Sequence, residues 1–483
     1  MAVFSNEEKT FVINDDGTVN EVSGRLRGRE QKSVDGTKAA FIVSDTTWSA
    51  GTLYYASGKG APVKVAEDVL DFVLSDSGEG MAFYVNYDPS AYVADLMVYD
   101  VKDAQAHAID HNAYYRDSGD YYYNFYHYIG SYAVISPDGK SVMYKADYEN
   151  GEHTLKINVN GKSDTVGRNA DGIAVADGAK FMYFTKTTDT GTALYASKGT
   201  DAQEVRLDRV STGVSYNRYH FNADYSQIVF VNADGRTCIS VRGGDKSNLA
   251  NSVVVLFLVP DNARFRAYEG GYDAHNVYVY GFGDFKNSVF LSGNGELNAI
   301  DGKLEKQVIA GDVSIGNSTV SKDGKWVYYV NYSGILKKAS ASDSTLPAQT
   351  VASGVSDFVL APDGDTVYYI TLDGELYQKK SGAEGRGTKI DGNAYVGYDY
   401  DAILISGDGK VYFLSDVWAG KGTLYGVSGT KKNRVRDDVY GVYAGARDFY
   451  YFVDGETYYD VYVINDGKTP KIAARDVTEI RLG

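Results

Sequence analysis

One short motif recurs along most of this chain and constrains its fold more than any other feature. It consists of a small residue, one variable position, Asp-Gly, and then a run of apolar and aromatic residues. Asp can hydrogen-bond its own downstream backbone and Gly accepts a positive φ, so each copy predicts a tight turn between two strands. The clearest copies are residues 136–144, 321–329, 361–369 and 406–413.

Weaker copies of the motif fill the gaps between the clear ones. They lie near residues 35, 77, 177, 224, 272 and 446, so that successive copies are mostly 38–51 residues apart, with one step of 61. A period of this length is typical of one four-stranded antiparallel unit, or blade. A second landmark, residues 51–58, is repeated at 192–199 and 422–429 at a constant offset from the turns.

The composition also favours β-sheet. The chain has 43 Tyr and 53 Gly but only 7 Pro and 5 Met, and aromatic and β-branched residues are those that strands favour. Repeat and composition together predict an all-β fold of β-propeller architecture, with about ten to eleven four-stranded blade units.

About eleven units are many for one ordinary ring, so we expect two rings in one chain. Residues 25–260 would form a first propeller of about five blades and residues 261–483 a second of about five to six, with the junction near Pro260. Residues 1–24 would supply strands that complete the last blade. In this interpretation 474–481 is the inner strand of that blade and 9–19 contains later strands; the alternative is that both ends are independent.

The Ser/Ala-Pro-Asp-Gly turns followed by Val-Tyr-Tyr strands, as at 136–144 and 361–369, resemble those of TolB-like and DUF5050-type β-propellers of bacterial envelope proteins. The resemblance spans nearly the whole chain, and it implies a scaffold that binds proteins or ligands. Its motifs are structural turns, so no functional residue is carried over. The chain departs from these families in its number of units, since their propellers commonly have about six blades.

Charge and hydropathy limit the partners. Lys and Arg number 48 against 64 Asp and Glu, a net charge of −16, which disfavours nucleic acid as a partner and is also what keeps a large β protein soluble. The first residues do not resemble a signal peptide, and the longest apolar run, 253–259, is too short to span a bilayer. We expect no direct membrane insertion and an extracytoplasmic location whose targeting segment is absent from this sequence, with the cytoplasm left open.

Motifs that carry chemistry are not found. The sequence contains no Gly-x-Ser-x-Gly and no His-Glu-x-x-His. Cys238 is expected to be a small buried hydrophobe. His107 and His111 do not lie on an expected helix, and Asp399 and Asp401 are more simply solvated than calcium-binding. We therefore predict no catalytic residue, no metal and no cofactor.

The long step between the second and third turns contains an aromatic segment at 114–128. Tyrosine offers a flat apolar face and a hydroxyl with little entropy to lose, which suits sugar stacking and protein interfaces. The alternative is that these rings pack over the fold, since Tyr is also abundant in the core-like strands. The candidate ligand-binding residues are Tyr114, Tyr115, Tyr121, Tyr122, Tyr123, Phe125, Tyr126 and Tyr128.

Three functions fit this sequence. The first is a non-enzymatic binding scaffold of the bacterial cell envelope or surface that recognises a protein or glycan. The second is a propeller-type glycan lyase or hydrolase with carboxylates in the central channel, and the third is a structural spacer domain of a longer surface protein. Facing acids on the ring axis would favour the enzyme, whereas an axis filled by apolar side chains would favour the scaffold.

Overall fold

The computed structural model describes residues 1–483 except 15, 45–49, 116–132, 190, 201–202, 211–218, 252–253, 259–284, 286–287, 397–402, 407–408, 445–447, 466–468 and 479–483. The regular secondary structure of the described residues is β-strand, apart from one short 3-10 helix, η1 (Asp177–Ala179). The prediction of an all-β chain is confirmed.

The strands follow one another with short connections. In chain order the first are β1 (Ala2–Ser5), β2 (Lys9–Ile13), β3 (Val19–Ser23), β4 (Arg25–Lys32), β5 (Ala39–Ser44), β6 (Gly51–Ala56), β7 (Val63–Val69), β8 (Asp71–Leu74), β9 (Gly80–Asp88), β10 (Val93–Asp100), β11 (Gln105–Tyr114), β12 (Ala133–Ile135), β13 (Ser141–Glu149), β14 (Glu152–Val159), β15 (Lys162–Arg168), β16 (Ala170–Val175), β17 (Met182–Thr188), β18 (Gly191–Ser197), β19 (Val205–Arg209), β20 (Tyr219–Phe221), β21 (Gln227–Val231) and β22 (Thr237–Val241). They continue with β23 (Lys246–Ala250), β24 (Val254–Leu258), β25 (Val289–Ser292), β26 (Leu297–Ile300), β27 (Lys306–Ala310), β28 (Val313–Val320), β29 (Trp326–Asn331), β30 (Ile335–Ser340), β31 (Gln349–Ser353), β32 (Val355–Leu360), β33 (Thr366–Thr371), β34 (Leu376–Lys380), β35 (Thr388–Asp391), β36 (Ile403–Ile405), β37 (Val411–Trp418), β38 (Lys421–Ser428), β39 (Lys431–Val439), β40 (Gly441–Ala444), β41 (Asp448–Asp454), β42 (Tyr459–Asn465) and β43 (Lys471–Val477).

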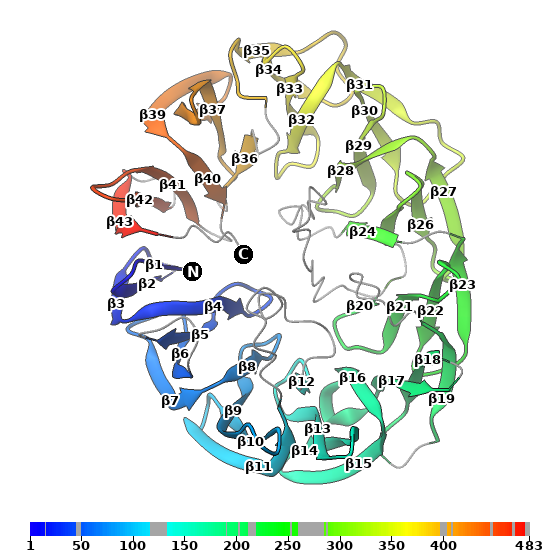
Figure 1. Cartoon of the computed structure of the whole chain (residues 1–483). Coiled ribbons are helices and arrows are strands. Elements are labelled where there is room, and N and C mark those ends of the chain that lie inside the picture. The colour runs from blue at the N-terminus through cyan, green and yellow to red at the C-terminus, as the bar shows by residue number, and fades with distance from the viewer. Residues whose placement is uncertain are drawn as a thin grey trace.

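The described strands pair with their neighbours in sequence, all antiparallel. They form one three-stranded sheet, β1–β3, eight four-stranded sheets, and one eight-stranded sheet, β8–β15. In the eight-stranded sheet β11 meets β13 at a single residue pair, Ala113 and Ala146, so it consists of two four-stranded groups in edge contact. Figure 1 shows the sheets following one another around one ring with their first strands toward the middle. This arrangement is that of a β-propeller.

The core of the ring lies between sheets. Each sheet shares a cluster of buried apolar residues with the sheet before it and another with the sheet after it. Tyr328 of β29 and Tyr369 of β33, for example, lie in the cluster between their two sheets. The second strands of most sheets are buried on both faces, which explains their continuous Val-Tyr-Tyr runs.

The N-terminal sheet stands between the last sheet and the second. Phe4 packs edge-on against Tyr450 and Phe452, with ring centroids 5.7 and 6.1 Å apart, while Val3 and Val12 pack against the sheet β4–β7. The amide of Thr478 donates to the carbonyl oxygen of Ser5 at 3.2 Å. The end of β43 is therefore in contact with β1, and the clusters run around the ring without a break at the termini.

Three sequence expectations need correction or stay open. Residues 474–477 belong to β43, the last strand of the sheet β40–β43, and are not an inner strand; residues 479–481 lie outside the described part. Two rings are not confirmed. The expected boundary at 260/261 lies in the connection between β24 and β25, which pair with each other in one sheet, so it does not separate two sheets.

The predicted turn connects the first strand to the second in most sheets. At 136–141 the Ser136 hydroxyl donates to Asp138 Oδ1 at 2.6 Å and accepts from the amide of Ser141 at 2.9 Å. Asp138 Oδ1 also accepts from the amide of Lys140 at 3.0 Å, and Gly139 has φ +78°. The turns at 33–38 and 321–326 have the same serine–aspartate bond at 2.6 Å. We call the end of the sheets that carries these turns the turn face.

Turns of neighbouring sheets touch each other on the turn face. The amide of Val34 donates to the carbonyl of Asp76 at 2.9 Å, and the amide of Ser77 donates to that of Pro137 at 3.0 Å. A Cβ at Gly139 would lie 2.6 Å from the Cα of Gly80 on the neighbouring strand, closer than atoms can approach. Glycine is therefore required at 139 for close packing as well as for its positive φ.

We predict that Gly139→Ala lowers the thermal unfolding midpoint more than Gly235→Ala. Both residues have nearly the same positive φ, +78° and +77°, but a Cβ at Gly235 meets nothing within 4 Å. The backbone strain is thus matched, and the difference between the two midpoints measures the turn-to-turn contact alone. Equal midpoints by calorimetry would show that the contact between these sheets is loose.

Candidate functional site

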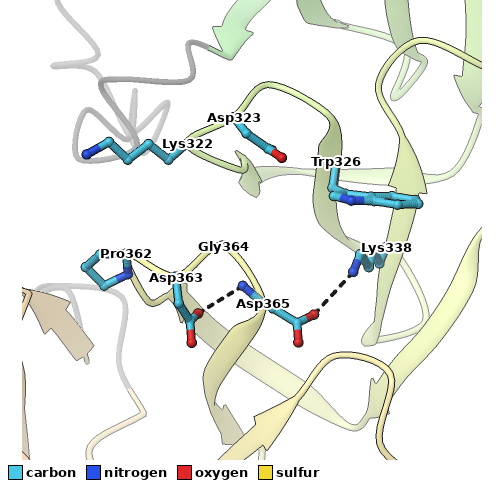
Figure 2. Close-up of a pocket in the computed structure, with 8 residues that line it drawn as sticks. All are labelled: Lys322, Asp323, Trp326, Lys338, Pro362, Asp363, Gly364 and Asp365. Atoms are coloured by element: carbon cyan, nitrogen blue, oxygen red, sulfur yellow. Dashed lines mark hydrogen bonds and ion pairs between the residues drawn. The ribbon is translucent and has the colours of Figure 1, made fainter.

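A depression of about 490 Å³ opens on the turn face between two neighbouring sheets (Figure 2). It lies between the turn at 321–326, which leads into β29, and the turn at 361–366, which leads into β33. Both turns are clear copies of the repeated motif. The residues that line it are Lys322, Asp323, Trp326, Lys338, Pro362, Asp363, Gly364 and Asp365.

Two of its carboxylates are fixed by the turns that carry them. Asp323 accepts from the Ser321 hydroxyl at 2.6 Å and from the amide of Lys325 at 3.1 Å, and these bonds lower its pKa. Burial alone would raise the pKa of Asp363, but hydrogen bonds from Lys380 Nζ and from Thr366, both 2.6 Å long, hold it well below its usual range. Both side chains are ionised at neutral pH and line the depression.

An indole ring forms the other wall. Lys338 Nζ lies 4.5 Å from the centroid of Trp326 and 5.6 Å from that of Tyr328. The same ammonium group donates to Asp365 at 3.3 Å (Figure 2). It also donates to the Ser381 hydroxyl at 2.9 Å. Because Lys338 is held on three sides, it fixes the half-buried Trp326 ring in place. The depression therefore combines a rigid aromatic surface with ionised acceptors.

A second group of carboxylates on the turn face joins sheets that are not neighbours in sequence. The Tyr225 hydroxyl, before β21, donates to Asp76 Oδ2 at 3.0 Å, and Asp177 Oδ1 accepts from the amide of Asp138 at 2.9 Å. Burial raises the pKa of Asp76 from 3.8 to about 6; the bond from Tyr225 opposes the shift and the charge of Asp177 adds to it. Within the described residues no group of three His, Cys, Asp or Glu side chains is placed to hold a metal ion.

Two of the aromatic residues predicted as ligand-binding are described. Tyr115 is buried, with its ring centroid 5.3 Å from that of Tyr84 and 5.2 Å from that of Tyr87, so it packs in the core between two sheets. Tyr114, at the end of β11, stacks on Tyr148 with the centroids 4.5 Å apart. The others lie outside the described residues and stay a prediction: Tyr121, Tyr122, Tyr123, Phe125, Tyr126 and Tyr128.

The structure also describes Cys238 and His111, which were singled out in the sequence. Cys238 is fully buried in β22, as predicted. His111 Nδ1 lies 2.8 Å from Asp95 Oδ1 at an exposed position, whereas Asp399 and Asp401 lie outside the described residues. No helix in the described part of the chain is long and apolar enough to cross a membrane.

Sequence reasoning treated Asp323, Trp326 and Asp363 only as members of a structural turn. The depression forms because two copies of the turn stand side by side and only one of them is followed by Trp. The signal that could have found it is this single tryptophan, Trp326, where the other clear copies have Ser141, Thr366 and Lys410 before the strand.

Comparisons with known proteins add little beyond the fold. No family model matches the chain, so the resemblance to DUF5050-type propellers is not confirmed, and no curated protein matches it. Similar solved structures include TolB from Acinetobacter baumannii, with 13% identity over 65% of this chain and a TM-score of 0.29. The chain covers 63% of that protein.

For two further solved structures, the match covers nearly the whole length of the other chain. A eukaryotic initiation factor is 9% identical over 80% of this chain and 95% of its own, with a TM-score of 0.41. The β-propeller domain of the Trilobed protease from Pyrococcus furiosus is 12% identical over 75% and 97%, with a TM-score of 0.31. Two of these three are TolB and a named propeller domain, in line with the turn motifs, but likeness at this level carries no argument about function.

We predict that Asp76→Asn raises the thermal unfolding midpoint at about pH 7.5 and changes it much less at about pH 4.5. The folded-state pKa of Asp76 is raised to about 6, so the native state binds its proton more tightly than the unfolded state. The stability that this proton provides is present at low pH and is lost as the pH rises through about 6. Asparagine removes the buried charge and keeps an acceptor for Tyr225.

Asp35→Asn is the control with the opposite sign. Burial raises the pKa of Asp35, but hydrogen bonds from Ser33 and Thr37 outweigh it and lower the pKa overall. Its substitution should therefore lower the midpoint at both pH values, because the stability of a carboxylate whose pKa is lowered on folding is lost only below the unfolded value of 3.8. Differential scanning calorimetry of both variants at the two pH values measures this, and a constant effect of Asp76→Asn across them would contradict the assignment.

Proposed function

We propose that this chain is a non-enzymatic binding scaffold of the bacterial cell envelope or surface, and that the depression in Figure 2 binds a hydroxyl-rich ligand of the glycan class. The observation that carries the proposal is the indole of Trp326 held rigidly beside the ionised Asp323 and Asp363. Sugars present hydroxyl donors to carboxylates and apolar C–H faces to aromatic rings, so this pair of features suits them. Loops on a rigid scaffold are where binding residues usually lie.

The state of the carboxylates supports binding over catalysis at this position. Glycoside hydrolysis needs one carboxyl group that is protonated near neutral pH to act as the general acid. The pKa values of Asp323, Asp363 and Asp365 are all lowered, so each one accepts hydrogen bonds and none is suited to donate a proton. The depression can therefore hold a sugar and orient it, and it supplies no general acid.

A second candidate function, a glycan hydrolase, rests on Asp76. Its pKa is raised to about 6 while Asp177 stands nearby, which is the kind of pairing that an acid catalyst uses. Against it, Asp76 Oδ2 already accepts the Tyr225 hydroxyl within the packed turns. Release of reducing ends from bacterial polysaccharides, abolished by Asp76→Asn, would favour the enzyme, and its absence favours the scaffold.

We predict that Asp323→Asn weakens glycan binding about tenfold, because a hydrogen bond to a charged acceptor contributes roughly 1.5–3 kcal/mol. Asparagine retains the oxygen that accepts from Ser321 and Lys325, so the turn is kept. The probe is an array of purified bacterial surface polysaccharides, with hits measured by isothermal titration calorimetry.

Asp35→Asn is the matched control for this experiment. Asp35 has the same serine–aspartate bond of 2.6 Å in a turn of another sheet, and it does not line the depression. Binding should be unchanged in this variant. If Asp35→Asn weakens binding as much as Asp323→Asn, or if no polysaccharide binds the native chain, the depression is not a glycan site.

A further inference from the structure

The end of the sheets opposite to the turn face carries the hairpins between second and third strands, and we call it the hairpin face. Four successive sheets there each expose one large apolar side chain. These are Tyr332 after β29, Leu372 after β33, Trp418 at the end of β37 and Tyr458 before β42, exposed by 65%, 66%, 86% and 41%. We call these four residues the apolar arc; their sheets are neighbours in Figure 1.

The fold does not require large apolar residues at these tips. In two preceding sheets the position that corresponds to Tyr332 and Leu372 is Ala233 or Gly293. The turn is the same in each case, because the amide of a glycine donates to the carbonyl three residues earlier at 2.9 or 3.0 Å: Gly235 to Asn232, Gly295 to Ser292, Gly334 to Asn331 and Gly374 to Thr371. Exposure of the apolar side chains of Tyr332 and Leu372 to water is therefore unfavourable in free energy, and these side chains do not shape the turn.

Neighbouring hairpins of the arc are tied together. The amide of Leu372 donates to the carbonyl of Gly354, which lies between β31 and β32, and the amide of Val355 donates to that of Gly334, each at 2.9 Å. Further along, Asn393 Nδ2 donates to Asp416 Oδ1 at 3.0 Å. A rigid surface loses little entropy when a partner binds, so these ties favour docking.

The last two tips are linked by an ion pair and an aromatic contact. Lys421 Nζ lies 2.5 Å from Asp454 Oδ2 in the next hairpin and 4.7 Å from the centroid of Tyr440. The Tyr458 hydroxyl donates to Glu7 Oε1 at 3.4 Å, which connects the arc to the hairpin between β1 and β2. The four tips thus form one continuous edge of the hairpin face.

The hairpin tips of the arc carry more acidic than basic residues, and two of the acidic residues are paired: Asp454 with Lys421, and Glu375 with Lys389 of β35 at 2.6 Å. The hairpins at 331–334, 372–375, 416–421 and 454–458 contain one basic residue, Lys421, and five acidic residues, which are Asp373, Glu375, Asp416, Asp454 and Glu456. The hairpin between β1 and β2 adds Glu7 and Glu8. Apolar side chains rimmed by acidic groups are complementary to a segment that carries both apolar and basic residues.

We propose that the apolar arc is a docking surface for a segment of a partner protein that contains both basic residues and leucine or similar apolar residues. The apolar side chains of the segment would cover Tyr332, Leu372 and Trp418, and its Lys or Arg residues would face the acidic rim. A second copy of this chain is disfavoured, because its net charge of −16 and its own acidic rim would repel the first. A glycan is disfavoured because Leu372 has no aromatic face for stacking. The site is separate from the depression, which lies on the turn face.

The test uses three fluorescent synthetic peptides of about 15 residues, which is long enough in extended form to span several hairpins. One alternates Lys and Leu, one alternates Glu and Leu, and one alternates Lys and Ser. By fluorescence anisotropy the Lys/Leu peptide should bind the full chain at least about tenfold more tightly than either of the others, and its affinity should fall as salt is raised.

The variant that tests the site combines Tyr332→Ala, Leu372→Ala and Trp418→Ala. It should weaken the Lys/Leu peptide about tenfold or more and leave the thermal midpoint nearly unchanged, because alanine already occupies this turn position at Ala233. The matched control is Val63→Ala with Val308→Ala, which removes exposed apolar side chains, 52% and 46% exposed, from outer strands β7 and β27. If the triple variant proves less stable, Leu372→Ala alone replaces it.

Several outcomes would overturn the proposal. The Glu/Leu peptide could bind as tightly as the Lys/Leu peptide, or the native chain and the triple variant could bind the Lys/Leu peptide equally well. The control variant could lose binding. The arc could instead mediate self-association that the triple variant abolishes, or polysaccharide binding that depends on the same three residues. The Asp323→Asn variant tests the depression on the opposite face, so the glycan proposal and the docking proposal can each fail independently of the other.

Discussion

The packing of each sheet against the next is the interaction on which the rest of the structure depends. A four-stranded sheet of this length cannot bury both of its apolar faces alone, and here every described cluster joins two sheets. Stability is therefore shared around the ring, and an unfilled position would expose two faces at once. The sheet β1–β3 fills that position, with Phe4 and Phe11 facing the last sheet and Val3 and Val12 facing the next.

The turn motif explains how so many sheets keep the same spacing. Ser136, Asp138 and Gly139 bond within their own turn, and Gly139 also packs closely against Gly80 of the neighbouring group of strands. The same residues that shape one hairpin therefore set its distance to the next. This double use of one turn is also what places Asp323 and Asp363 on either side of a depression.

The sequence predicted strands, turns and blade-sized units well, because these depend on local chemistry. The Asp-Gly turn and the apolar and aromatic run that follows it lie within about ten residues of each other. The number of rings could not be predicted in the same way. It depends on the angle between successive sheets, which sets how many sheets close one ring, and the repeat period does not specify that angle. The predicted boundary near Pro260 follows the apolar run that ends at Val259, and it falls within one sheet.

The candidate sites were harder to predict for a related reason. Trp326 and Leu372 look like ordinary members of a repeat, and only their exposure and their neighbours in the folded ring distinguish them. The tyrosine-rich segment breaks the repeat; of its two described members, Tyr115 is a core residue and Tyr114 stacks on Tyr148.

The central claim is that all the sheets belong to one ring closed by β1–β3. A cryo-electron microscopy map of the isolated chain tests it most directly. The account predicts one round particle in which the N-terminal sheet lies between the sheets β40–β43 and β4–β7. Two discs joined by a linker, or a ring with a gap beside β43, would contradict it.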